Sequence, residues 1–579
     1  MKNTTRMHSL YLTCLLTFCI SLIACSNTDQ LAGNQTEQSL RQQAVAMPDR
    51  FSANVAMEIL DKGGNAVDAA IAAQFALAVT LPEAGNIGGG GFMVVHFENR
   101  DGQGSENTFI DYRETAPQAA HRDMYLDEQG NVKRMESLFG ILASGVPGTV
   151  SGMHKAHQRY GSLPWAELVA PAVRLARNGF VVPEKLANNV KRYLERIEKR
   201  QLDVNCADYF SELESGKVFR QAELANTLER IQNQGPDGFY KGETASLIHA
   251  FMQKHGGLIT RDDLAKYKAK WREPVISNWR EYQLVSAAPP SSGGIAVSQW
   301  LRMYDIVKRN QNIEFSHNSA PYIHVLSEIG KRVFADRAEY LGDPDFYEVP
   351  RQDLLAQSYL ENRAQDIRLD AISATDSIQA GLDESEQTTH FSIVDKFGNA
   401  VSNTTTINLG FGSGMVVEGA GFLLNDEMDD FSAKAGVPNY FGAIGGKANE
   451  IQPNKRMLSS MTPTIVLHND KLKMVTGSPG GTTILSSVYL SILHALEFDL
   501  PVQTVVDAPR FHHQLLPEDE IRHHQGLSEE VIAELQAMGY TTRESRFGDV
   551  HVVIQRDGKL EAASESNGRG KALVKPNNK

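Results

Sequence analysis

Ser478-Pro479-Gly480-Gly481 stands directly before an apolar stretch, residues 482–496, that predicts a helix. The first N–H groups of a helix have no partner inside the helix, so they can bind an anion. Two glycines let a substrate carbonyl approach those N–H groups, which can then stabilise the oxyanion of an acyl transfer. A tight strand-to-helix turn explains the same residues equally well. The segment therefore indicates either an oxyanion hole or a turn.

Two other patterns could indicate a nucleotide-binding loop or a metal site, but each has a better explanation. The run Gly88 to Gly91 is followed by no Gly-Lys-Ser/Thr and lacks the spacing of a dinucleotide fingerprint, so close packing of helix against strand explains it better. The pairs His512-His513 and His523-His524 have no acidic or Cys ligand at zinc spacing, and neighbours on a strand point to opposite faces. We expect no metal and no cofactor.

The elements that position these residues are hairpins and long helices. Three hairpins are predicted, over residues 390–406, 464–476 and 551–563, with turns at 396–399, 469–470 and 557–558. Residues 65–80 predict a helix that starts at an Asn cap and is apolar on nearly every side, which is typical of burial between layers. Residues 164–380 predict mainly helices, with a break at 289–294. Such a pattern favours an α+β fold with antiparallel sheet covered by helices.

The N-terminus resembles an export signal. Lys2 and Arg6 precede an apolar stretch, residues 10–23, that is too short to span a membrane comfortably. It ends in Leu22-Ile23-Ala24-Cys25, which resembles the lipobox of bacterial lipoproteins, although an ordinary signal peptide with a chance Cys is the alternative. We expect a signal peptide at 1–24, a lipidated polar tether at 25–43, and a periplasmic protein anchored through Cys25 to the outer membrane of a Gram-negative bacterium.

Composition excludes several classes of protein. The chain has 579 residues, of which 41% are hydrophobic and 22% charged, so it can bury a large core and is neither disordered nor a disulfide-stapled miniprotein. Its formal net charge of -13 and the lack of a basic run argue against a nucleic-acid partner. If Cys25 carries lipid, Cys206 has no partner for an intramolecular disulfide after export.

Taken alone, Gln387-Thr388-Thr389-His390 is typical of the start of a strand. Together with other motifs it indicates a known family. With them the chain resembles bacterial gamma-glutamyltransferase (gamma-glutamyl transpeptidase) precursors from about residue 44 to 555. The matching stretches are Asp111-Tyr-Arg-Glu-Thr-Ala-Pro117, Pro289-Pro-Ser-Ser-Gly-Gly294, Thr388-Thr-His-Phe-Ser-Ile-Val-Asp395, Asp429-Asp-Phe-Ser432, Pro453-Asn-Lys-Arg456, Leu458-Ser-Ser-Met-Thr-Pro463 and Ala508-Pro-Arg-Phe-His-His513.

The resemblance implies an N-terminal-nucleophile hydrolase with a four-layer αββα fold, in which two antiparallel sheets lie between helices. It implies self-cleavage between Gln387 and Thr388 into a large subunit, 44–387 after the tether, and a small catalytic subunit, 388–579, which together form one domain and a heterodimer. A Thr hydroxyl needs a base, and the new α-amine of Thr388, with a pKa of ~8, can take its proton. Thr406, by family position, would orient Thr388.

The implied substrates are glutathione and other γ-glutamyl compounds, with water, amino acids or dipeptides as acceptors. Gly480 and Gly481 would stabilise the oxyanion. The γ-glutamyl group carries an α-carboxylate and an α-ammonium, so the site needs donors and acceptors. The donors would be Arg113, Ser459 and Ser460, and the acceptors Asn408, Glu427 and Asp430. Taken singly, each has a plainer explanation: a surface arginine, a turn at 459–460 and a helix cap at 429–430.

Three departures from the family pattern bear on detail. Glu427 stands where close relatives often have Gln, and Phe441, preceded by Tyr440, stands where some have a lid Tyr. Glu565-Ser566-Asn567 replaces the more usual Asp-x-Arg and leaves the packing of the C-terminus open. The rival readings are a glutaryl (cephalosporin) acylase of the same superfamily, which has no ammonium to bind, and a lipid-anchored binding protein that never matures.

Overall fold

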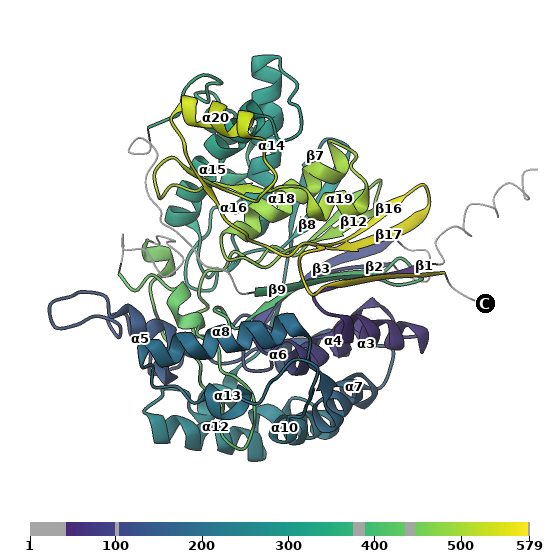
Figure 1. Cartoon of the computed structure of the whole chain (residues 1–579), viewed down its shortest axis with the longest axis vertical. Coiled ribbons are helices and arrows are strands. Elements are labelled where there is room, and N and C mark those ends of the chain that lie inside the picture. Colours follow the sequence, from purple (N-terminus) through teal and green to yellow (C-terminus); the bar gives the residue numbers. More distant parts are fainter. Residues whose placement is uncertain (1–41, 99–103, 375–387, 435–445, 577–579) are drawn as a thin grey trace, which may run out of the picture.

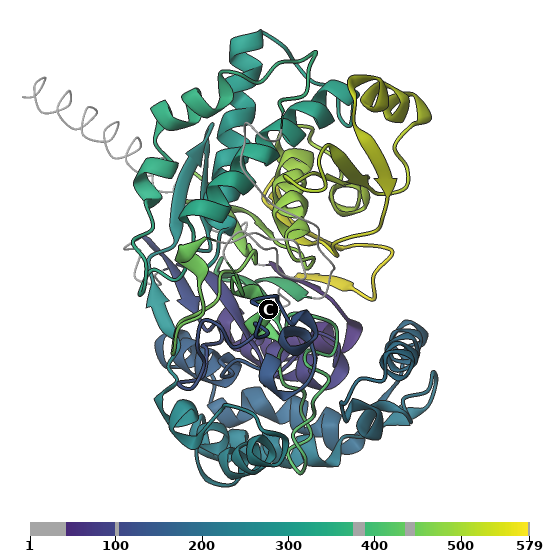
Figure 2. The same cartoon turned by 90° about the vertical axis from the view of Figure 1, so that its left-hand side faces the viewer.

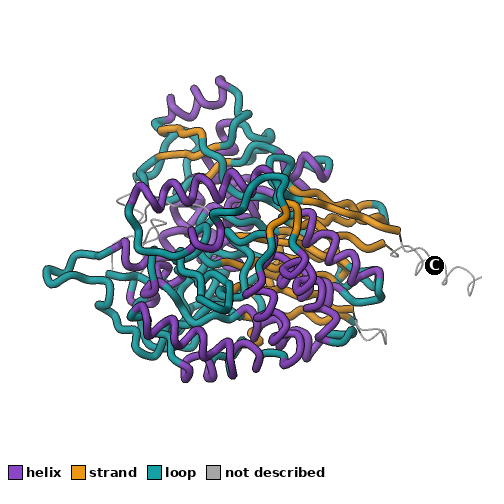
Figure 3. Tube along the Cα trace, turned by 60° about the horizontal axis from the view of Figure 1, so that its bottom comes forward, coloured by secondary structure: helices purple, strands orange, loops and turns teal. Residues whose placement is uncertain are grey.

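Two antiparallel sheets lie face to face at the centre of the molecule, and helices cover both outer sides (Figure 1). The computed structural model describes residues 42–98, 104–374, 388–434 and 446–576. After a turn of 90°, helices lie at the two ends of the molecule and strands lie between them (Figure 2). The tube coloured by secondary structure also shows the strands surrounded by helices (Figure 3). The expected four-layer αββα fold is confirmed.

Each large sheet is antiparallel throughout. In spatial order the seven-stranded sheet contains β18 (Lys571–Pro576), β1 (Gln42–Met47), β9 (Thr388–Val394), β10 (Ala400–Thr406), β2 (Gly90–Glu98), β3 (Ser105–Asp111) and β6 (Lys270–Arg272). The six-stranded sheet contains β17 (Lys559–Ser564), β16 (His551–Arg556), β12 (Lys471–Thr476), β11 (Thr464–His468), β8 (Tyr282–Ser286) and β7 (Val275–Trp279). Two small sheets are formed by β13 (Phe511–His512), β14 (Glu520–His523) and β15 (Thr541–Glu544), and by β4 (Phe180–Val181) and β5 (Val218–Phe219).

Alternation along β2 shows why the seven-stranded sheet is buried on both faces. Met93 and Val95 join one apolar core with the helices on the outer side, while Phe92 and Val94 join a second core that includes residues of the other sheet. Successive side chains of a strand point to opposite faces, so a strand apolar at every position needs a layer on each side.

The helices form two outer layers. The layer on the seven-stranded sheet includes α3 (Arg50–Asp61), α4 (Ala66–Thr80), α6 (Thr149–Tyr160), α7 (Trp165–Asn178), α8 (Glu184–Arg200), α10 (Ala222–Gln234), α12 (Gly242–His255) and α13 (Arg261–Lys266). The layer on the six-stranded sheet includes α14 (Gly293–Gln311), α15 (Ala320–Tyr340), α16 (Arg351–Leu354), α17 (Gln357–Ala364), α18 (Thr483–Leu496), α19 (Val502–Asp507) and α20 (Glu529–Met538). Within the described ranges there are also the short helices α5 (Arg134–Leu138), α9 (Cys206–Phe210) and α11 (Asp237–Tyr240). As predicted, α4 is capped by Asn65 and wholly buried.

The three predicted hairpins are confirmed as β9–β10, β11–β12 and β16–β17. One expectation is incomplete, because residues 164–380, predicted to be mainly helical, also supply the short strands β4 and β5 and the sheet strands β6, β7 and β8. Strand β7 alternates buried and exposed positions, but with five residues between long helices it is a weak sequence signal.

Both sheets mix strands from either side of residue 388, so the segments before and after that point share one core. The C-terminus is packed despite its unusual sequence: β18 pairs with β1, and Glu565 accepts a hydrogen bond from Arg510 at 2.6 Å. Gln387, Cys25, the signal and tether segments, Tyr440 and Phe441 lie outside the described residues. Among the helices that the structure describes, none is both long and apolar enough to cross a membrane.

Candidate active site

Thr388 and Thr406 face each other near the middle of the seven-stranded sheet. Thr388 begins β9, and the antiparallel register pairs it with Thr406 at the end of β10. The Thr388 hydroxyl donates to Thr406 Oγ1 at 3.4 Å, and Thr406 Oγ1 also accepts from the Asn408 N–H at 2.7 Å. The strand pairing therefore brings the expected nucleophile and its expected orienting hydroxyl together.

The Gly480–Gly481 turn leads into α18. Both glycines have positive φ, 130° and 55°, and a Cβ on Gly480 would lie 2.4 Å from Thr483 Oγ1. Only glycine meets both demands at Gly480, because other residues rarely adopt this conformation and no space exists for a side chain. The turn reading and the oxyanion reading of this segment are thus compatible.

One small cavity collects nine of the ten residues that the sequence assigns to catalysis or substrate binding. Its lining residues are Arg113, Arg337, Thr388, Thr406, Asn408, Glu427, Asp430, Ser459, Ser460, Met461, Gly481 and Ile484. Gly480 belongs to the adjoining turn and is the one assigned residue outside this lining. These residues come from segments more than 300 positions apart, so the fold brings them together.

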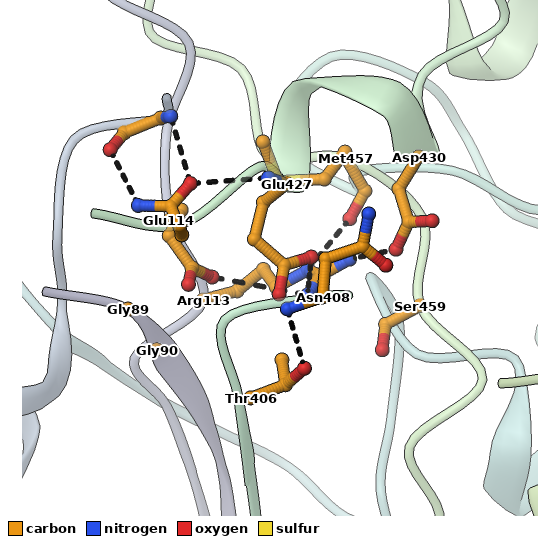
Figure 4. A network of polar contacts seen from close by, with 12 residues as sticks. Gly89, Gly90, Arg113, Glu114, Thr406, Asn408, Glu427, Asp430, Met457 and Ser459 are labelled. Carbon is orange, nitrogen blue, oxygen red and sulfur yellow. Dashed lines mark hydrogen bonds and ion pairs between the residues drawn. The ribbon is translucent and has the colours of Figure 1, made fainter. Parts of the chain in front are cut away.

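Arg113 is the centre of a buried charge cluster (Figure 4). Its side chain is 1% exposed and forms ion pairs with Glu427 and Asp430, and its Nη1 lies 3.8 Å from Glu114 Oε2. Burial alone would lower the pKa of Arg113, but these carboxylates raise it overall. Burial raises the pKa of Glu114 to about 8 and the pKa of Glu427 well above its usual range, although Arg113 opposes both shifts.

This pairing differs from the contacts that the sequence predicts for these residues. The sequence assigns Arg113 to a carboxylate and Glu427 and Asp430 to an ammonium, whereas the structure pairs the three with one another. Buried charges without a ligand are stabilised by pairing. A zwitterion can exchange these contacts, since it offers a carboxylate to Arg113 and an ammonium to the acids.

Ser459 and Ser460 are held by the 289–294 segment that the sequence singled out. Pro290 O accepts from the Ser459 N–H at 2.9 Å, and Ser292 donates to Ser459 O from its N–H at 2.8 Å and from its hydroxyl at 3.0 Å. The segment therefore fixes the backbone of the serine pair against the start of α14.

The glycine run at 88–91 does provide close packing, but against strand β10 and neighbouring loops and not between a helix and a strand as expected. A Cβ on Gly89 would lie 2.2 Å from Thr406 O, and one on Gly90 would lie 2.5 Å from Glu114 Oε2. The run lets β2 approach β10 and the charge cluster closely, and Figure 4 shows Gly89 and Gly90 beside Glu114.

Sequence reasoning missed Arg337 and Glu114. Glu114 follows Arg113 inside a quoted motif, so its position was the available signal. Arg337 lies on α15 and is 6% exposed, and a cation on an otherwise buried helix face was its only signal. Within the described ranges, no group of three or more His, Cys, Asp or Glu side chains is arranged to hold a metal ion.

Thr388 also lies on the wall of a second, larger cleft of about 900 Å³. Its other walls include parts of α8, of residues 81–84 and of residues 546–569, and they carry Lys185, Arg546 and Arg569. The nucleophile candidate thus stands between a small polar cavity and an open cleft.

Comparisons with known proteins show to which family the chain is related. The sequence profile of the family described as Gamma-glutamyltranspeptidase matches residues 52–575. The chain is 51% identical over 539 residues to the glutathione hydrolase proenzyme of Pseudomonas aeruginosa, covering 92% of this chain and 94% of that one. It is 45% identical over 533 residues to the glutathione hydrolase proenzyme of Escherichia coli, covering 91% and 90%.

Solved structures show the same relationship. A gamma-glutamyltranspeptidase from Pseudomonas nitroreducens, complexed with L-DON, is 51% identical with a TM-score of 0.54, covering 57% of this chain and 96% of that one. A cephalosporin acylase from Bacillus halodurans is 26% identical with a TM-score of 0.79, covering 92% and 96%. The chain belongs to the gamma-glutamyltranspeptidase family.

Proposed function

We propose that the chain is a self-cleaving gamma-glutamyltransferase, which hydrolyses or transfers the γ-glutamyl group of glutathione and related amides through an ester on Thr388. The observation that carries the proposal is the composition of the small cavity beside Thr388. It combines a guanidinium and two serines with the carboxylates of Glu427 and Asp430. A γ-glutamyl group, zwitterionic at one end and an amide at the other, matches that combination.

Maturation cuts the bond between Gln387 and Thr388. The Thr388 hydroxyl attacks the carbonyl carbon of Gln387, and the C–N bond between the two residues breaks, which frees the α-amine and leaves an ester. Water then hydrolyses the ester and releases the Thr388 hydroxyl and the Gln387 carboxylate. The cut leaves a small subunit of residues 388–579 and a large subunit that ends at Gln387. The two subunits stay together as a heterodimer, because each of them contributes strands to both sheets.

Acylation then uses groups that the fold places around Thr388. The freed α-amine takes the proton of the Thr388 hydroxyl, and Oγ1 attacks the γ-carbonyl. Thr406, 3.4 Å from Thr388 Oγ1, orients the hydroxyl. The N–H groups of Gly480 and Gly481 stabilise the oxyanion. The amine leaves with the transferred proton, and water or an acceptor amine resolves the ester.

Substrate binding fills the small cavity with the γ-glutamyl group. Arg113, Ser459 and Ser460 receive the α-carboxylate, while Asn408, Glu427 and Asp430 receive the α-ammonium. The leaving amine extends into the larger cleft, because Thr388 borders both spaces.

The rival function is a glutaryl acylase, which the cephalosporin acylase neighbour represents structurally. A glutaryl group has no ammonium, so it would leave the carboxylates of Glu427 and Asp430 without their counter-charge. Rates on γ-glutamyl and glutaryl p-nitroanilides separate the two functions. We expect the γ-glutamyl donor to be preferred by at least about tenfold in kcat/KM, since a site with unpaired buried polar groups rejects the analogue. Preference for the glutaryl donor would overturn the proposal.

For localisation we propose export and anchoring of the mature chain to the outer membrane through lipid on Cys25. Support comes from the basic start, the short apolar stretch and the Ala24-Cys25 junction. Cells fed a labelled fatty acid should label the wild-type protein and not the Cys25→Ser variant. Equal labelling of both proteins, or labelling of neither, would contradict lipidation at this residue.

A further inference from the structure

Arg337 is a second buried guanidinium in the small cavity. It lies on α15, lines the cavity together with Arg113 and the serine pair, and its side chain is 6% exposed. Its Nη2 donates to Ser460 Oγ at 3.1 Å, and its Nε donates to Ser292 Oγ at 3.2 Å. Because α15 precedes residue 388 and Ser460 follows it, this contact joins the two sides of the proposed cut.

The direction of these hydrogen bonds determines what Ser460 can do. A guanidinium has N–H donors and no acceptor, so Ser460 Oγ must accept from Arg337. The Ser460 hydroxyl proton then remains available, and the described part of the chain offers it no acceptor. Since Ser460 lines the cavity, its O–H is left to donate to a ligand.

Ser292 extends the same arrangement to Ser459. Ser292 Oγ accepts from Arg337 Nε and donates to Ser459 O at 3.0 Å. Arg337 therefore fixes the hydroxyl of one serine directly and supports the backbone of the other through Ser292.

The charges around Arg113 give Arg337 a second role. Glu427, Asp430 and Glu114 all lie beside Arg113, so a carboxylate ligand meets three acids and one cation at that end. Arg337 adds a second cation to the same cavity, and its charge acts to lower the pKa of Asp430 against the effect of burial. Without Arg337 an anionic ligand group faces a larger negative surplus.

We propose that Arg337 is a positioning residue that makes the cavity selective for donors carrying an α-carboxylate. It does so by directing the Ser460 hydroxyl proton into the cavity and by offsetting the acids around Arg113. This inference rests on the proposed function, because it concerns the carboxylate of the γ-glutamyl donor. Thr388 and the Gly480–Gly481 turn make none of these contacts, so the chemical step depends on Arg337 only through donor binding.

The test compares two donors, γ-glutamyl-p-nitroanilide and 4-aminobutyryl-p-nitroanilide, which lacks the α-carboxylate. Arg337→Met should raise KM for the γ-glutamyl donor about tenfold, as expected for loss of a charge-assisted hydrogen bond. It should change kcat much less, and it should leave kcat/KM for the carboxylate-free donor within about twofold of wild type. Arg337→Lys keeps the charge and should restore part of the preference.

Arg363→Met is the matched control. Arg363 packs beside the same helix and donates to Asp336 at 2.8 Å, but it does not line the cavity. Its removal tests the loss of a neighbouring buried ion pair and should leave the donor preference unchanged. In the double variant Ser460→Ala with Arg337→Met, KM for the γ-glutamyl donor should be no higher than in the more damaging single variant. The reason is that both changes remove the same interaction between Arg337 and Ser460.

Three outcomes would overturn the inference: an unchanged donor preference in Arg337→Met, an equal loss on both donors, or fully additive effects with Ser460→Ala. If Arg337→Met fails to mature, the same comparison is made with Arg337→Lys, and an unchanged KM and preference there would also overturn it. Failure of the proposed function is separately visible, because the wild-type protein would then release no nitroaniline from the γ-glutamyl donor.

Discussion

At the scale of the residue, the account rests on Thr388 having a hydroxyl and, after the cut, an α-amine. Its partner Thr406 accepts from the Thr388 hydroxyl at 3.4 Å, and the Gly480–Gly481 turn supplies backbone N–H groups. Each of these groups has a separate part in the proposed chemistry, so single substitutions should separate cleavage from turnover.

Thr388→Ala removes the attacking oxygen from both reactions. We expect an uncut chain with no measurable γ-glutamyl transfer, because neither self-cleavage nor acylation can begin. Thr388→Ser keeps a hydroxyl and should still be cut, more slowly than wild type. Normal two-band processing of the alanine variant on a denaturing gel would refute the nucleophile assignment.

Glu114 gives a pH prediction. Burial raises the pKa of Glu114 from 4.5 to about 8, so the folded state holds this proton more tightly than the unfolded state. The stabilising contribution is therefore fully present below pH 4.5 and is lost as pH rises towards 8. The melting temperature of the wild type minus that of Glu114→Gln, measured from pH 4.5 to 8.5, should fall as pH rises. A flat or rising difference would contradict the shift.

At the scale of the element, the sequence predicted those helices, hairpins and turns that depend on residues close together in the chain. The hairpin of β9 and β10, the cap at Asn65 and the glycine turn before α18 all follow from local chemistry. Strand β8 was missed because its pairing with β11 is set by residues far away in the chain, and β7, which pairs only with β8, was missed with it. Arg337 was missed for the same reason, since its partner Ser460 lies 123 positions away.

Gly89 tests how closely β2 must approach β10. In Gly89→Ala the new Cβ would meet Thr406 O at 2.2 Å, and that oxygen is backbone and cannot swing aside. We expect a loss of about 1–3 kcal/mol of stability from overpacking, together with slower cleavage because Thr406 is displaced from Thr388. Gly446→Ala, whose Cβ would have its nearest contact at 3.5 Å from Ala338 O, should change neither. Equal melting temperatures for the two variants would count against this packing.

At the scale of the whole molecule, the segments on either side of residue 388 form one unit. A buried network joins them: Arg456 Nε lies 3.3 Å from Asp111, and Arg456 N–H donates to Asp343 at 2.8 Å. The same network holds Arg113 in place, because Asp111 accepts from the Arg113 N–H at 3.0 Å. Association of the two subunits and geometry of the site are thus linked.

Arg456→Met should therefore weaken the mature heterodimer. The change takes one of two cations from the buried Asp111 carboxylate, which keeps Arg272 at 2.7 Å, so the cost should be below the roughly 3–5 kcal/mol of a fully broken buried ion pair. Lys575→Met is the control, since its pair with Asp61 also crosses between the segments but is about half exposed and contributes at most about 1 kcal/mol. Urea midpoints of subunit separation measure both, and equal midpoints would show that the Arg456 network does not hold the subunits together.

N-terminal sequencing of the smaller band from a denaturing gel tests whether the chain cuts itself before Thr388. The purified wild-type protein should give two bands, and the smaller one, residues 388–579, should begin Thr388-Thr389-His390. A single uncut band from a protein active on γ-glutamyl donors, or a small band that begins at any other residue, would contradict self-cleavage at this bond.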